Sequence, residues 1–256
     1  MTSSPDEAVP ARCLPRVRSV ASWPITFGHR GARAYAPENT IAGFQLALVQ
    51  QAGALETDAW LARDGVPVLV HDATIRRPGR RVHVVRRTSA ELAAFGVPTL
   101  SDLYRSCGTD FELSIDVEHA AVALALVDVA EFFGAAERLW LCAEDPLVLD
   151  LLRRRTAHVR LICSTGPRRL GGLRSLVPRL AELDVDVVNL HWLDWTARRF
   201  DLVRGSGLLG FGWDAQEDVA IDHLLAIGID AIYADRPDHL VARVRGKGAA
   251  GLIGHA

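Results

Sequence analysis

Short apolar runs alternate with longer amphipathic stretches over most of the chain, and this rhythm limits the fold more than any other feature. The runs lack a clean polar–apolar alternation, which is typical of a parallel sheet covered by helices. Eight strands are expected, at residues 25–28, 54–58, 111–117, 139–142, 159–163, 185–190, 208–211 and 231–233. Helical spacing is found at residues 40–51, 120–133, 146–155, 173–183, 195–204 and 219–227.

Strand–helix repetition of this kind implies right-handed βαβ units. Eight strands in 256 residues favour an α/β fold of the (β/α)8 TIM-barrel type, which has about that size; a doubly wound open sheet is the alternative. Residues 64–100 break the rhythm with a short strand at 66–70 and an arginine-rich stretch, so we expect a short insertion after the second strand. The expected barrel domain covers residues 24–246, between a flexible arm at 1–23 and a flexible tail at 247–256.

The bulk composition excludes several classes of protein. The formal net charge of −2 offers no basic field for a nucleic-acid partner. No stretch approaches the roughly 20 apolar residues that a transmembrane helix needs, and the first residues lack the apolar region of a signal peptide. The four cysteines are widely spaced and form no CxxC pair. These features predict a cytoplasmic protein with no transmembrane segment.

Three polar clusters each follow an expected strand, at the end of a barrel where active-site groups converge. In the first, His29 and Arg30 end the first strand. The forked donors of an arginine match two phosphate oxygens, so this pair indicates a phosphate ligand. Asn39 and Thr40 follow, and two interpretations stay open for them: a helix N-cap or a direct role in the site.

The second cluster is Glu56-Thr57-Asp58. Residues two apart in a strand face the same side, so both carboxylates point one way. Such a pair needs a cation or a basic partner, and hard divalent cations prefer oxygen ligands. In the third cluster, a run of apolar residues ends at His71. Together with His29 it provides two imidazoles, as acid–base chemistry on a phosphodiester requires.

The order of these motifs resembles the N-terminal signature of the glycerophosphodiester phosphodiesterase family. The similarity continues less sharply to about residue 240, through the PTL segment at 98–100 and the ADRP segment at 234–237. The motifs that carry it are HRG at 29–31, PENT at 37–40, GALETD at 53–58 and DGVPVLVHD at 64–72.

The resemblance implies a TIM barrel that hydrolyses a small glycerophosphodiester to glycerol 3-phosphate and an alcohol, with a divalent cation, Mg2+ or Ca2+, as cofactor. The residues that it implicates are His29 and His71 as the acid–base pair, Arg30 on the phosphate, and Glu56, Asp58 and Asp116 on the metal.

The chain departs from the family pattern after the third barrel strand. Asp116 takes the place of a glutamate, and Glu118 stands where the family has a lysine expected to contact the phosphate. Two like charges 4 Å apart repel by about 4 kcal/mol at an effective dielectric constant of ~20. Three interpretations of Glu118 stay open: a fourth metal ligand, a side chain that turns away while His119 or another basic residue supplies the charge, or a weakened enzyme.

These departures leave two alternative functions. One is a phosphodiester-binding barrel with little activity, motivated by Glu118. The other is a lysophospholipase D-like enzyme, motivated by the short, arginine-rich insertion. Trp213 follows the seventh strand, and it is expected either to bind substrate in the pocket or to pack in the core.

Overall fold

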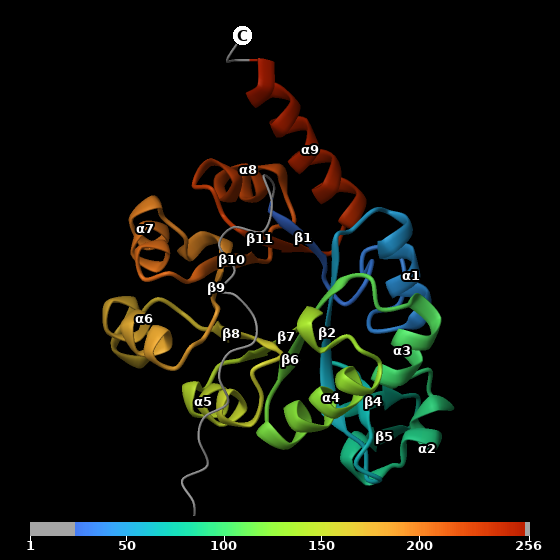
Figure 1. Cartoon of the computed structure of the whole chain (residues 1–256). Helices are drawn as coiled ribbons and strands as arrows, with labels where there is room; N and C mark the ends of the chain where they lie inside the picture. The colour runs from blue at the N-terminus through green and yellow to red at the C-terminus, as the bar shows by residue number, and fades with distance from the viewer. Residues whose placement is uncertain (1–23, 254–256) are drawn as a thin grey trace, which may run out of the picture.

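The computed structural model of the chain describes residues 24–253, so the expected arm at 1–23 and residues 254–256 lie outside the described residues. β1 (Ile25–Gly28) pairs in parallel with both β2 (Ala54–Leu61) and β11 (Ala231–Ala234), which closes the sheet into a barrel (Figure 1). The barrel strands between them are β6 (Glu112–Val117), β7 (Leu139–Ala143), β8 (Arg160–Ser164), β9 (Val187–His191) and β10 (Leu209–Trp213). The TIM barrel is confirmed, and closure excludes the open sheet.

Helices surround the barrel strands (Figure 1), and the six stretches with helical spacing are all helical. The α-helices of this ring are α1 (Ile41–Val49), α3 (Leu100–Cys107), α4 (Ala120–Phe132), α5 (Pro146–Arg155), α6 (Leu173–Glu182), α7 (Ala197–Gly205), α8 (Asp218–Ala226) and α9 (Pro237–Ile253). Short 3-10 turns occur at η1 (Val84–Arg86), η2 (Ala136–Arg138), η3 (Arg169–Gly171) and η4 (Trp192–Asp194).

The end of the chain differs from the expectation. The backbone of residues 247–253 continues α9, where the sequence predicted a flexible tail. α9 packs against β1, so the last helix closes the ring on the outside. In the part of the chain that the structure describes, no helix has both the length and the apolar character needed to span a bilayer.

The insertion after the second strand is present and has its own small core. β3 (Pro67–Leu69) runs antiparallel to β2, and a hairpin of β4 (Thr74–Arg77) and β5 (Arg80–His83) precedes α2 (Ser89–Ala93). The core of the insertion consists of Ala62, Val68, Val82, Val84, Leu92 and Val97. The sequence predicted the insertion and β3 but not the hairpin.

Aromatic side chains fill the barrel interior. The rings of Phe27 and Tyr233 stack with their centroids 4.5 Å apart, and Trp140 packs against Phe211 at 5.3 Å. A second, larger apolar layer lies between the strands and the helices. Because the interior is packed solid, the polar groups at the carboxyl ends of the strands have a rigid floor.

Candidate active site

Three carboxylates meet at the carboxyl ends of β2 and β6. Glu56 and Asp58 lie two residues apart on β2 and point into the barrel, as the strand period predicted. Asp58 is in register with Asp116 on the neighbouring strand β6. One oxygen from each of the three side chains lies within 4.8 Å of the others. We call these residues the carboxylate cluster.

The electrostatics of the cluster favour a bound cation. Desolvation, followed by the negative charges of Asp58 and Asp116, raises the pKa of Glu56 well above its usual value. Desolvation and the charge of Asp58 raise the pKa of Asp116 to about 6. The three oxygens therefore repel one another when ionised. A hard divalent cation prefers such an all-oxygen set, so the residues present fit a divalent metal ion.

A tight turn after β1 brings Arg30 to the cluster. The backbone N–H of Arg30 donates to Glu56 Oε2 at 2.9 Å, and its Nε lies 3.1 Å from Asp58 Oδ2. Arg30 Nη1 also donates to Glu38 Oε2 at 3.1 Å. The turn needs Gly31, because its φ is +84° and a Cβ there would meet the backbone of Gly43 at 2.6 Å.

The structure separates the roles that stayed open for Asn39 and Thr40. The hydroxyl of Thr40 accepts a hydrogen bond from Gly43 N at 3.2 Å and caps α1. Asn39 is buried and faces the cluster instead. Its Nδ2 donates to Asp58 Oδ2 at 3.1 Å, and its Oδ1 accepts from the hydroxyl of Thr57 at 2.7 Å. Asn39 therefore orients a carboxylate of the cluster.

His29 is oriented by an acid from the other end of the chain. Its Nδ1 lies 2.5 Å from Asp235 Oδ1, and its Nε2 lies 3.8 Å from Glu56 Oε2. Burial of Asp235 raises the pKa of that group, but the hydrogen bond and charge of His29, followed by Arg33, lower it overall below its usual value. The ionised carboxylate accepts, so Nδ1 carries the proton and Nε2 faces the cluster.

The sequence did not single out Asp235 as a site residue. The signal for it was its place directly after β11, at the carboxyl end of a barrel strand.

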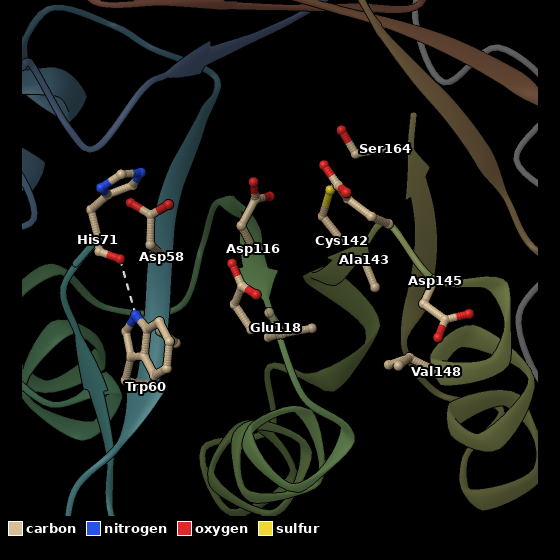
Figure 2. A pocket seen from close by; sticks show the side chains of 13 residues that line it. Asp58, Trp60, His71, Asp116, Glu118, Cys142, Ala143, Asp145, Val148 and Ser164 are labelled. Atoms are coloured by element: carbon tan, nitrogen blue, oxygen red, sulfur yellow. Dashed lines mark hydrogen bonds between the residues drawn. The ribbon is translucent and has the colours of Figure 1, made fainter. Parts of the chain in front are cut away.

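His71 reaches the cluster through the insertion. β3 runs back along β2, and Val70 N donates to Asp58 O at 3.0 Å, so the chain returns to the level of Asp58. The indole N–H of Trp60 donates to the carbonyl oxygen of His71 at 3.0 Å and fixes the backbone there. The imidazole Nδ1 pairs with Asp72 Oδ1 at 2.9 Å. His71 and Asp58 line the same cavity (Figure 2).

Two adjoining cavities open at the mouth, each lined by one of the two histidines. The His71 cavity has a volume of about 380 Å³ and the His29 cavity about 310 Å³; Asp116, Glu144 and Ser164 line both. Arg30 and Glu56 also line the His29 cavity. All the residues expected to act on substrate or metal thus converge on the mouth of the barrel.

Trp213 lines the His29 cavity with 41% of its surface exposed, so the core interpretation of Trp213 is wrong. Its ring packs edge-on against His191, with centroids 4.6 Å apart. His191 is itself held by Asp214, at 3.1 Å from Nε2, and by the backbone N–H of Leu193.

Glu118 faces the His71 cavity from the end of β6, on the same side as Asp116 (Figure 2). The side chain of Glu118 therefore does not turn away from the site. In the described part of the chain, however, the carboxylate cluster does not include it. Glu144 and Asp145 line the same cavity. Of the described residues that line the two cavities, Arg30 is the only arginine or lysine. Within residues 24–253, the walls of the His71 cavity thus contain no arginine or lysine in place of the lysine expected at position 118.

Residues 29–239 match the Glycerophosphoryl diester phosphodiesterase family. The chain belongs to this family. It is therefore a phosphoric diester hydrolase. A glycerophosphodiester phosphodiesterase of Caldanaerobacter subterraneus is 23% identical over 246 residues, covering 88% of this chain and 99% of that protein. A glycerophosphodiester phosphodiesterase domain-containing protein 5 of Gallus gallus is 43% identical over 65 residues, covering 25% of this chain and 11% of that protein.

Solved structures of the family share the fold. A glycerophosphoryl diester phosphodiesterase structure from Silicibacter pomeroyi superposes with a TM-score of 0.80 at 21% identity, covering 89% of this chain and 95% of that one. A phosphodiesterase of Oleispira antarctica, solved in complex with the product sn-glycerol-3-phosphate, gives a TM-score of 0.74 at 19% identity, covering 87% of this chain and 97% of that one. At these identities the likeness concerns the fold.

Proposed function

We propose that the chain hydrolyses glycerophosphodiesters to glycerol 3-phosphate and an alcohol, with a divalent cation, Mg2+ or Ca2+, held by the carboxylate cluster. The observation that carries the proposal is the convergence of Glu56, Asp58 and Asp116 within 4.8 Å at the mouth, with His29 and His71 in the cavities beside them. When bound, the cation supplies positive charge to phosphate oxygens, where negative charge develops during the reaction.

Arg30 is the residue that binds the substrate phosphate. Its guanidinium lies at the cluster and lines the His29 cavity, while Asp58 and Glu38 hold it in place. Because these contacts fix Arg30 before substrate arrives, little side-chain entropy is lost on binding. Trp213 offers the face of an indole to the carbon atoms of the substrate on the same side.

The two imidazoles carry the protons. One accepts the proton of the attacking oxygen, and the other donates a proton to the departing alkoxide. Asp235 holds the proton of His29 on Nδ1, so its Nε2 is directed to the reacting groups. His71 pairs with Asp72 in a similar way. The cavities lie side by side, which allows the histidines to act on different oxygens of one phosphorus.

A substrate panel tests the proposal. Purified protein would be incubated with glycerophosphodiesters of several alcohols and with lysophospholipids, with and without a chelator, and the products would be identified by mass spectrometry. We expect glycerol 3-phosphate from the water-soluble diesters, and loss of turnover by orders of magnitude with chelator or with His29→Ala. Turnover that survives both changes would contradict the mechanism. Cleavage of lysophospholipids alone would support the lysophospholipase D-like alternative, and binding without turnover the weakened barrel.

A second experiment assigns the two histidines. A diester with a p-nitrophenolate leaving group needs no proton donor, because that anion departs unaided. The variant of the acid histidine should therefore lose far less activity on this diester than on an alkyl diester, whereas the variant of the base histidine should lose both. His29→Ala and His71→Ala would be compared by kcat on both substrates. Equal losses in all four cases would contradict an acid–base pair.

A further inference from the structure

Asn189, which lines the His29 cavity, has a buried hydrogen-bond acceptor without a partner among the described residues. Asn189 lies on β9 and only 6% of its surface is exposed. Its Nδ2 donates to the hydroxyl of Ser164 at 3.3 Å, but its Oδ1 is buried and accepts no hydrogen bond in the described part of the chain. Buried side-chain oxygens are nearly always paired, so an unpaired one that borders a cavity indicates a ligand.

The chemistry of Asn189 limits the kind of ligand group that could pair with its Oδ1. The cavity is also lined by His29, Arg30, Trp213 and Tyr233. A neutral amide oxygen accepts a hydrogen bond from a donor, and an ionised phosphodiester has no donor of its own. In a glycerophosphodiester, the glycerol hydroxyls are the donors that every member of the class carries, whatever its alcohol.

We propose that Asn189 accepts a hydrogen bond from a glycerol hydroxyl, so that the His29 cavity holds the glycerol side of the substrate. This inference rests on the proposed function. The carbon atoms of the glycerol pack against the indole of Trp213, and the phosphate stays between Arg30 and the carboxylate cluster. The alcohol then extends toward the His71 cavity. Asn189 is thus a specificity-determining residue, separate from the groups that move protons.

Such an acceptor discriminates strongly between ligands. A site built around a hydrogen bond to a hydroxyl rejects an analogue that lacks it, because the buried acceptor is left unpaired. For one neutral acceptor, we expect a preference of about 10- to 100-fold for the ligand that carries the hydroxyl. This preference appears in binding and does not depend on catalysis.

Binding of two phosphate monoesters tests the inference. Glycerol 3-phosphate and n-propyl phosphate carry the same charge and the same carbon chain, but only the first has hydroxyls. Titration calorimetry on the metal-loaded protein would give the ratio of their dissociation constants. We expect wild type to prefer glycerol 3-phosphate by at least about 10-fold, and Asn189→Leu, which has nearly the same shape, to bind both equally.

Two further variants separate recognition from folding. Asn189→Asp keeps an acceptor oxygen at the same reach, so it should keep the preference even though the added charge weakens both ligands. Ser114→Ala removes a hydroxyl that accepts from the cavity-lining Tyr233 at 3.3 Å; Ser114 itself is not among the described residues that line the cavity, so this variant too should keep the preference. The thermal midpoint of each variant would show that it is folded.

The outcomes are distinct. A wild-type ratio near one, or a wild-type ratio retained in Asn189→Leu, would overturn the role of Asn189. Absence of diester turnover in wild type would overturn the proposed function instead, while the calorimetric ratio would still report on Asn189. As a second readout, Asn189→Leu should raise the KM for a glycerophosphodiester about 10-fold and change kcat less, because the residue acts in binding.

Discussion

Asp235 and His29 lie 206 positions apart in the chain, yet their side chains meet at 2.5 Å where β11 and β1 end next to each other. The closure of the barrel is what brings them together, because the first and the last strand become neighbours only when the ring closes. The carboxylate of Asp235 also pairs with Arg33 at 3.2 Å, and the backbone N–H of Asp235 donates to Gln216 Oε1 at 2.9 Å. The proton position on His29 therefore depends on the ring being complete.

We predict that Asp235→Asn lowers kcat by roughly 10²-fold, less than His29→Ala, which removes the imidazole itself. The amide of the new asparagine can either accept or donate a hydrogen bond, so it no longer holds the proton of His29 on Nδ1. The imidazole therefore loses its defined tautomer and orientation. The KM should change by only a few fold, since the phosphate contacts remain. Steady-state kinetics on one diester would measure both parameters.

The matched control is Asp238→Asn, which changes an exposed carboxylate nearby that accepts from the hydroxyl of Tyr35 at 3.0 Å. An equal loss of activity in both variants would show that Asp235 has no special part in the reaction.

Asn39 and Thr40 provide a second, matched pair. Asn39→Ala removes the group that orients Asp58, so we expect metal affinity to fall about 10- to 100-fold, with activity recovered at saturating metal. Thr40→Ala removes the cap of α1 and should cost about 1 kcal/mol of folding stability without changing metal affinity. Metal titrations and thermal melts on both variants would test this. A loss of folding stability alone in Asn39→Ala, with a loss of metal affinity in Thr40→Ala, would refute the roles assigned to these two residues.

The metal-free protein should become less stable as the pH rises. The pKa of Glu56 is raised well above its usual value and that of Asp116 to about 6, so the folded state holds protons that the unfolded chain has already released. Stability is therefore lost as pH rises from about 4, where a free carboxyl ionises, through about 6. Added Mg2+ or Ca2+ should restore it, more at pH 7.5 than at pH 4.5.

Denaturation midpoints in chelator, measured across this range, would show the trend. Asp116→Asn should weaken the dependence of the midpoint on pH, because the variant cannot ionise at this position. A midpoint in chelator that stays constant from pH 4.5 to 7.5 would contradict the electrostatic account of the cluster.

Glu118 should set the preference for the alcohol group. Its carboxylate faces the His71 cavity, so Glu118→Gln removes a charge that repels anionic substrates. We expect kcat/KM to rise several fold for diesters with an anionic alcohol group and to fall for those with a cationic one. Glu144→Gln is the control, because Glu144 lines the same cavity but pairs with Arg169, which already offsets its charge. If kcat/KM changed by the same factor for all of these diesters, the result would count against selection of the alcohol group by its charge.

The sequence was sufficient to predict the barrel, because the burial of parallel strands leaves a local signature. Each apolar run could be recognised from its own residues, without knowing which strand it pairs with. All eight runs are strands of the barrel. The β4–β5 hairpin was missed since its alternating pattern is masked by exposed arginines at 76, 77, 80 and 81. The continuation of α9 was missed because glycine and alanine between 246 and 251 suggested a loose end.

Within the site, the residues that the sequence could place together were those on short, contiguous motifs. Glu56 and Asp58 share one strand, so the two-residue period placed both on one side. Asn189 lies on a strand late in the chain between two apolar residues, and Asp235 stands in the ADRP segment, to which the sequence assigned no role in the site. Their roles arise from closure of the ring, which a linear pattern does not encode.

The packed aromatic floor formed by Phe27, Trp140, Phe211 and Tyr233 fills the barrel beneath the site. Under the proposed function, the cation, the substrate and both products would all pass through the mouth. A product still lying over the carboxylates therefore blocks the way out for the ion beneath it, so exchange of the metal should wait on departure of the product.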